Sequence, residues 1–238
     1  MSTEPLDVPT LIFRCPQELR GRLPEPSPAG AKIPRWLKDM PAEALSATTG
    51  AVDDTVKRCP PFVDAMTRGF LMPLMCDVRV EAGAFVWDSD LPPAGAIAYP
   101  RSPIGFHDPG QVAGAPLFDA DQVLVKFHNL WTIEAPDGYA VLFTHPLNRF
   151  DLPFTTLSGI VDCDRYFDSW VHFPALWRDP TFSGVLPRGT PVAQCIPVKR
   201  ETWSAQIEAQ DEEAMQRTHA LNAEIAAEKG VYRRRFRA

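Results

Sequence analysis

The segment that decides the fold is Leu157–Glu201, which reads LSGIVDCDRYFDSWVHFPALWRDPTFSGVLPRGTPVAQCIPVKRE. Its short apolar runs are broken by Pro, Gly and Asp, a pattern typical of strands joined by tight turns. A second segment of this kind lies upstream at Ala135–Phe154, APDGYAVLFTHPLNRFDLPF. The two segments together predict a compact, mainly β protein.

The composition agrees with this prediction. The 238 residues include 25 prolines and only 14 glycines. Proline has no backbone N–H to donate, so it is confined to turns, strand ends and sheet edges. The net charge of −6 argues against general nucleic-acid binding, which needs a basic surface. Arginines cluster only near the C-terminus, at 233–237, where a solvated tail is the simplest interpretation.

The cysteines and the N-terminal sequence indicate the cellular compartment. Five widely spaced cysteines with no C-x-x-C pair match neither a disulfide framework nor a zinc site. The N-terminus lacks the basic and apolar regions of a signal peptide, and no apolar run is long enough to span a membrane. We therefore expect a cytoplasmic protein that does not bind membranes.

We expect three regions: an extended N-terminal arm at 1–50, a β-barrel domain at 51–200, and a C-terminal helix with a basic tail at 201–238. Within the first two regions, short helices are predicted at Pro34–Met40 and Pro61–Thr67. The helix at Glu201–Lys229 is predicted because this stretch lacks Pro and Gly and is rich in Ala, Glu and Gln. Strands are predicted at Thr10–Arg14, Phe70–Val80 (interrupted at Pro73), Ala84–Asp88, Val123–Phe127, Trp131–Glu134, Tyr139–Phe143, Gly159–Asp162, Ser169–Phe173 and Val192–Val198. Their spacing favours a sandwich or barrel.

Two motifs resemble the trimeric dUTPase and dCTP deaminase superfamily. Gly159, Ile160, Val161, Asp162 and Asp164 match its G-[VI]-[IV]-D-x-D-Y segment, and Gly189, Val192, Ala193 and Gln194 match its G-x-R-[IV]-[AG]-Q strand. The resemblance covers roughly 135–200. It implies a β-clip fold, which is a pinched, jelly-roll-like barrel. It also implies that the carboxylate at the position of Asp162 activates a water molecule.

The sequence departs from that family where the phosphates are held. Thr144–Arg149 replaces the phosphate-binding turn, Pro191 stands where the second motif has its arginine, and no glycine-rich arm follows. A triphosphate needs several convergent cations and N–H donors, so we expect no dUTP or dCTP hydrolysis. The whole chain also resembles a family of uncharacterised bacterial proteins that carry segments like Val56–Met66, Pro136–Arg149 and Ile196–Trp203.

Asp162 and Asp164 are the candidate catalytic residues. They lie two positions apart, so a regular strand would place both carboxylates on one face. A carboxylate at a strand end can act as a general base. The alternative is that both aspartates shape a turn, because Asp readily accepts hydrogen bonds from its own backbone.

A second group of candidates would bind a small molecule. One amide and one guanidinium among aromatic side chains form a reasonable cradle for a ligand. The alternative is that the aromatic residues pack in the core. The candidate ligand-binding residues are His145, Asn148, Arg149, Tyr166 and Gln194.

The histidines raise the alternative of a metal centre. Imidazoles converging inside a barrel could hold iron, as in cupins and 2-oxoglutarate oxygenases. His128, His145 and His172 are the candidate ligands, although no H-x-H spacing is present. Histidines that simply hydrogen-bond within the fold are the competing interpretation.

Three hypotheses therefore remain open: a small-ligand-binding protein, an iron-dependent barrel oxygenase, and a structural or partner-binding protein. The N-terminal arm is too extended to bury much apolar surface on its own, and the C-terminal helix has too thin an apolar stripe to be a full core element. Both could wrap a neighbouring subunit and bury Trp36, Trp203 and Ile207 there; the alternative is that both fold back onto their own barrel and leave a monomer. We expect a homo-oligomer, with a trimer slightly ahead of a dimer.

Overall fold

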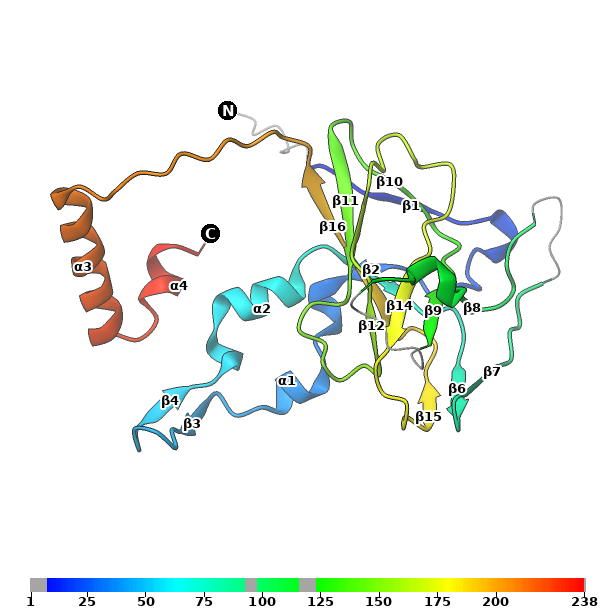
Figure 1. Ribbon diagram of the computed structural model, residues 1–238, viewed down its shortest axis with the longest axis horizontal. Coiled ribbons are helices and arrows are strands. Elements are labelled where there is room, and N and C mark those ends of the chain that lie inside the picture. Colours follow the sequence, from blue (N-terminus) through cyan, green and yellow to red (C-terminus); the bar gives the residue numbers. More distant parts are fainter. Residues whose placement is uncertain (1–7, 93–97, 116–122, 238) are drawn as a thin grey trace, which may run out of the picture. The chain divides into compact units, whose positions relative to one another are not determined.

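The computed structural model describes residues 8–92, 98–115 and 123–237. The chain divides into two units, 1–200 and 201–238 (Figure 1). The regular structure of the first unit is mainly antiparallel strand, which confirms the prediction of a mainly β protein. None of the sheets formed by the described residues closes on itself into a barrel.

Two sheets form the body of the first unit. The larger has the order β13-β11-β16-β5-β2 and the smaller has the order β12-β14-β9-β8. The strands of the larger sheet are β13 (Gly159–Val161), β11 (Tyr139–Thr144), β16 (Pro191–Lys199), β5 (Phe70–Pro73) and β2 (Ser27–Pro28). Those of the smaller are β12 (Phe154–Thr156), β14 (Phe173–Trp177), β9 (Leu124–Phe127) and β8 (Ile104–Phe106).

Smaller sheets complete this unit. A three-stranded sheet contains β15 (Gly184–Leu186), β6 (Val78–Glu81) and β7 (Ala84–Trp87). Two further pairs join β1 (Ile12–Arg14) to β10 (Thr132–Glu134), and β3 (Glu43–Leu45) to β4 (Val52–Asp54). The α-helices of this unit are α1 (Arg35–Asp39) and α2 (Pro60–Thr67), and short 3-10 helices lie at Gln17–Leu19, Ala29–Lys32, Val56–Arg58 and Pro109–Val112. Prolines at the start of α2 remove N–H groups that would have no helical partner.

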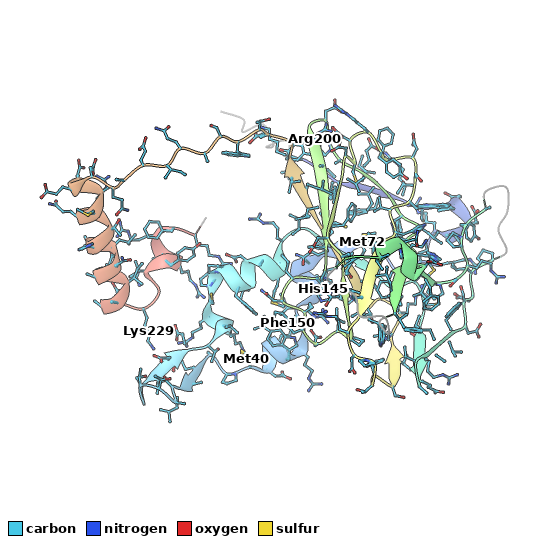
Figure 2. All side chains as sticks on the ribbon, in the orientation of Figure 1. Met40, Met72, His145, Phe150, Arg200 and Lys229 are labelled. Carbon is cyan, nitrogen blue, oxygen red and sulfur yellow. The ribbon has the colours of Figure 1, made fainter. Side chains whose placement is uncertain are left out.

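The main core lies among strands of the two larger sheets. Its buried residues include Met72 of β5, Phe127 of β9, Val141 of β11 and Cys195 of β16. The side chains of this region crowd together around Met72 (Figure 2). A second buried cluster contains Leu19, Leu23, Met75, Cys76, Leu91, Tyr99 and Leu130.

The N-terminal region expected as an extended arm is packed onto the sheets. Leu19 and Leu23 belong to the second buried cluster, and Leu37 of α1 is also buried. β1 and β2 pair with β10 and β5. Apolar residues between the prolines therefore anchor this segment at several points.

Three sequence predictions need correction. The strand expected at Ser169–Phe173 is β14 at Phe173–Trp177. The C-terminal helix expected from Glu201 is α3 (Glu212–Ala227), followed by α4 (Val231–Arg235). Ile160, whose place in a short apolar run bounded by turns predicts burial, is 64% exposed: on the edge strand β13 it is the neighbouring Val161, on the opposite face, that packs against the core. Part of the irregular region expected at 95–121 lies outside the described residues.

Candidate functional site

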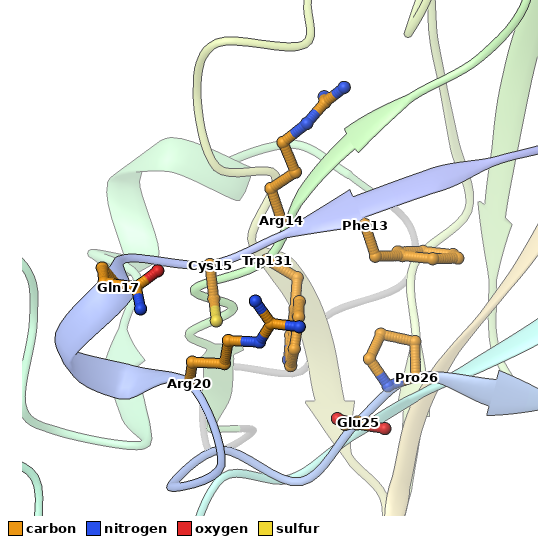
Figure 3. A pocket seen from close by; sticks show the side chains of 8 residues that line it. All are labelled: Phe13, Arg14, Cys15, Gln17, Arg20, Glu25, Pro26 and Trp131. Atoms are coloured by element: carbon orange, nitrogen blue, oxygen red, sulfur yellow. The ribbon is translucent and has the colours of Figure 1, made fainter.

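A cavity of about 560 Å³ lies between the segment after β1 and Trp131. It is lined by Phe13, Arg14, Cys15, Gln17, Arg20, Glu25, Pro26 and Trp131 (Figure 3). A second cavity of about 380 Å³ shares Arg14 and Cys15 with the first and extends to Asp168 and Trp170. The volume of the first lies within the roughly 300–1,000 Å³ typical of small-molecule sites.

The sequence of 15–26, CPQELRGRLPEP, explains the shape of this wall. Leu19 is fully buried, and its carbonyl accepts hydrogen bonds from the N–H groups of Arg22 and Leu23. Gly21, which follows Arg20, adopts φ +75°, a conformation that residues with a Cβ rarely take. Arg20 is therefore held between a buried anchor and a tight turn.

Glu25 is fixed in a different way. It lies between Pro24 and Pro26, and a residue before proline is restricted to extended backbone. The carbonyl of Pro24 accepts a 3.2 Å hydrogen bond from Nε1 of Trp131. This bond ties the Glu25 loop to the aromatic wall across the cavity.

Trp131 is also held by its own backbone. Its N–H donates to Oδ1 of Asn129 at 3.0 Å, and its carbonyl accepts from Nδ2 of Asn129 at 2.7 Å. Asn129 is buried and donates a further bond to the carbonyl of Val171. The indole is thus positioned before any ligand arrives.

Two charged groups of the lining have no partner among the described residues. Neither the guanidinium of Arg20 nor the carboxylate of Glu25 forms an ion pair or hydrogen bond with any part of the chain that the structure describes, whereas Arg14 pairs with Glu134. In Figure 3 the end of the Arg20 side chain reaches toward Trp131, and that of Arg14 points away. Burial raises the pKa of the Cys15 thiol, Arg20 lowers it, and the charge of Glu25 raises it again. Cys15 therefore stays a neutral thiol near neutral pH.

The candidate catalytic aspartates meet at Arg200. Nη1 of Arg200 lies 3.2 Å from Oδ2 of Asp162, and Nη2 pairs with Oδ2 of Asp164. The side chain of Asp164 is only 4% exposed and also accepts a 3.0 Å bond from the N–H of Gly138. The carbonyl of Asp162 accepts from the N–H groups of Arg165 and Tyr166. This geometry is that of a turn closed by an ion pair.

Four of the five predicted ligand-binding residues gather around the loop after β11, whereas Tyr166 lies in the turn after Asp162 and is half exposed. Gln194 is buried, accepts from the N–H of Leu147 at 2.8 Å, and donates to the carbonyls of Ala65 and Arg68. Asn148 donates to the carbonyl of Phe62. Arg149 forms a two-pronged ion pair with Asp151. Their polar atoms hold α2 and the β11–β12 loop together.

The candidate metal ligands divide into two places. The Nδ1 atom of His145 accepts from the N–H of Thr156, and its Nε2–H donates to the carbonyl of Arg149. Both ring nitrogens are therefore occupied. His128 and His172 do lie together, with ring centroids 5.0 Å apart. Across the described residues, no three His, Cys, Asp or Glu side chains gather closely enough to hold a metal ion.

The tautomers of the histidine pair are opposite. Nδ1 of His128 donates to the carbonyl of Ser102, so its Nε2 carries a lone pair. Nδ1 of His172 accepts from the N–H of Asn129, so its Nε2 carries the proton. Burial lowers the pKa of both rings, that of His172 to about 4. A metal held by both Nε2 atoms would need two lone pairs, and this arrangement supplies one.

Comparison with protein-family models and with the curated proteins found no match to this sequence. Among the described residues, no helix is both long and apolar enough to cross a bilayer. The cavity is therefore the feature from which a function can be inferred. Sequence reasoning missed it, although the closely spaced prolines and charges of 15–26 directly after a predicted strand were a usable signal.

Proposed function

We propose that this chain binds a small polar molecule in the cavity between 13–26 and Trp131. The observation that carries the proposal is the pair of charged side chains, Arg20 and Glu25, that line one cavity without a partner in the described structure. Charged groups on protein surfaces are commonly solvated, but these two are attached to a wall fixed by Leu19, Gly21 and Pro24. A preformed site of this kind lowers the entropy cost of binding.

Binding is favoured over catalysis by the state of the polar groups. The two candidate catalytic aspartates are engaged with Arg200, and Cys15 is a neutral thiol. A nucleophile needs an adjacent base or a lowered pKa. The pKa of the Cys15 thiol is instead raised, by burial and also by the charge of Glu25 in the same lining, so the thiol is not activated.

A thermal-shift screen of small polar metabolites tests this proposal. Gln17→Trp would fill the cavity from an exposed lining position, and Glu18→Trp adds the same bulk one residue away, outside the lining. We expect at least one compound to raise the melting temperature of the wild type and of Glu18→Trp but not of Gln17→Trp. Compounds that stabilise all three equally, or no stabilising compound at all, would contradict the proposal.

For the fold type, we propose the β-clip or jelly-roll arrangement that the dUTPase-like motifs imply, without the phosphate-binding reaction. The support is the main core cluster, whose buried residues come from strands of both large sheets. The replacement of the family arginine by Pro191 supports the absence of dUTP and dCTP hydrolysis.

A second candidate function is partner binding through the C-terminal unit. Trp203 and Ile207 are 83% and 97% exposed. Exposed apolar surface marks an interaction site when it is grouped, and these two side chains lie in one short segment, 201–210. We propose a homo-oligomer, trimer slightly ahead of dimer, in which a neighbouring subunit covers these two residues.

A further inference from the structure

We propose that the ligand of this cavity is an amino-acid-like zwitterion, whose carboxylate binds Arg20, whose ammonium group binds Glu25, and whose apolar part lies against Phe13 and Trp131. This assignment rests on the proposed function and specifies the class of molecule. It follows from the charges that the lining leaves available and from the aromatic groups around them.

The charge balance of the lining selects a zwitterion over an anion or a cation. Arg14 is paired with Glu134, and Cys15 is neutral, so one cation and one anion remain for a ligand. A dianion would find a single guanidinium and would be repelled by Glu25. A purely cationic ligand would leave Arg20 unpaired and repelled. A molecule with one charge of each sign satisfies both groups.

The two side chains suit these roles chemically. A guanidinium presents parallel N–H donors that match the two oxygens of a carboxylate. A carboxylate such as that of Glu25 accepts hydrogen bonds from an ammonium group, and a nearby aromatic face adds cation–π attraction. Arg20 and Glu25 come from opposite ends of one short loop, 20–25, so a bound zwitterion would bridge them.

The remaining wall is apolar. Phe13 packs edge-on against Phe70, with ring centroids 5.4 Å apart, and Trp131 is fixed through Nε1 and through Asn129. Pro26 adds a rigid apolar surface beside them. An apolar or aromatic side chain on the ligand is therefore favoured over a charged one.

Calorimetric titration with three matched probes tests the assignment. L-Phenylalanine carries both charges, 3-phenylpropanoate carries only the carboxylate, and 2-phenylethylamine carries only the ammonium group. We expect phenylalanine to bind at least about tenfold more tightly than either half-molecule, because each charged hydrogen bond adds that much or more. The strongest compound of the metabolite screen serves as the positive control for an intact cavity.

Two variants assign each charge to its residue. Arg20→Gln should weaken phenylalanine and 3-phenylpropanoate by about tenfold or more and leave 2-phenylethylamine unchanged. Glu25→Gln should show the reverse preference. Both residues are exposed, so neither change should alter the melting temperature of the unbound protein.

The outcomes separate this inference from the proposed function. If 3-phenylpropanoate binds as tightly as phenylalanine, or if Glu25→Gln changes nothing, the zwitterion assignment is wrong while the cavity remains a ligand site. If none of the three probes binds and the positive control does, the assignment is wrong again. If the positive control also binds equally to Gln17→Trp, the proposed function itself fails.

Discussion

The backbone N–H of Asn129 donates a 3.1 Å hydrogen bond to Nδ1 of His172, and the side chain of Asn129 holds the backbone of Trp131. A proton on Nδ1 of His172 would abolish this bond. The neutral histidine is therefore part of the framework that positions the aromatic wall of the cavity.

Stability should fall at mildly acidic pH for this reason. The pKa of His172 is lowered from 6.5 to about 4, mainly by burial and also by the charges of His128 and Lys126. Because the unfolded state binds the proton more readily, the contribution of His172 to stability is complete above pH 6.5 and is lost as the pH falls toward 4. His128 and His145, whose pKa values burial also lowers, act in the same direction. Urea denaturation at pH 7 and pH 5 measures the effect.

His172→Asn is the matched variant, since the asparagine oxygen can still accept from Asn129 but does not titrate. We expect a smaller loss of unfolding free energy between pH 7 and pH 5 than in the wild type. Identical losses in the two proteins would show that His172 is not the titrating group.

Replacing Gln194 should strongly destabilise the folded protein. This buried side chain accepts one hydrogen bond and donates two. Gln194→Leu would leave the N–H of Leu147 and the carbonyls of Ala65 and Arg68 without these hydrogen-bond partners. We expect a loss of about 3 kcal/mol or more in the free energy of unfolding, because each orphaned buried group costs roughly 1–3 kcal/mol. Gln216→Leu, at an exposed position of α3, is the control and should change little. A stability loss below about 1 kcal/mol for Gln194→Leu would contradict this account.

Ile160 and Val192 provide a paired test of the core. Ile160→Asp should fold at normal yield, since the side chain is 64% exposed on the edge strand β13. Val192→Asp should abolish folding, because Val192 is buried and an unpaired carboxylate there is too costly. Soluble yield and circular-dichroism melting distinguish the two. The account fails if the two variants behave alike.

The first unit should fold without the second. Both buried clusters of the sheets draw only on residues up to Cys195. A chain ending at Arg200 is therefore expected to melt as cooperatively as the full chain. Light scattering on the two proteins also tests assembly: we expect an oligomer for the full chain and a monomer for the shortened one. A mass near 26.5 kDa for the full chain over a wide concentration range would end the oligomer proposal.

The sequence predicted those helices and strands whose local residue pattern agrees with their position in the folded structure. Prolines mark the start of α2, and the nearly continuous apolar runs of β11 and β16 mark central strands. It misplaced β14 because Pro174 lies inside a central strand, where proline is normally excluded. The start of α3 was misplaced because composition does not locate a cap: Asp211 accepts from the N–H of Ala214, and 201–210 stay outside the helix.

The cavity was harder to foresee for a physical reason. His145, Asn148, Arg149 and Gln194 have functional side chains, but the fold uses their polar atoms for its own hydrogen bonds. Arg20 and Glu25 belong to no recognisable sequence motif. Whether their charged groups are available to a ligand depends on whether neighbouring side chains pair with them in the folded protein. Such availability arises only from tertiary structure.

The indole N–H of Trp131 offers the most direct measurement of the central claim, because it donates to Pro24 beside Glu25. In protein labelled with ¹⁵N-tryptophan, the Trp131 resonance can be assigned with Trp131→Phe. It can then be followed during titration with L-phenylalanine or with the strongest compound of the screen. We predict that this resonance shifts with saturation while those of Trp36 and Trp203 remain in place. Binding that leaves the Trp131 resonance unmoved would contradict the assignment of this cavity as the ligand site.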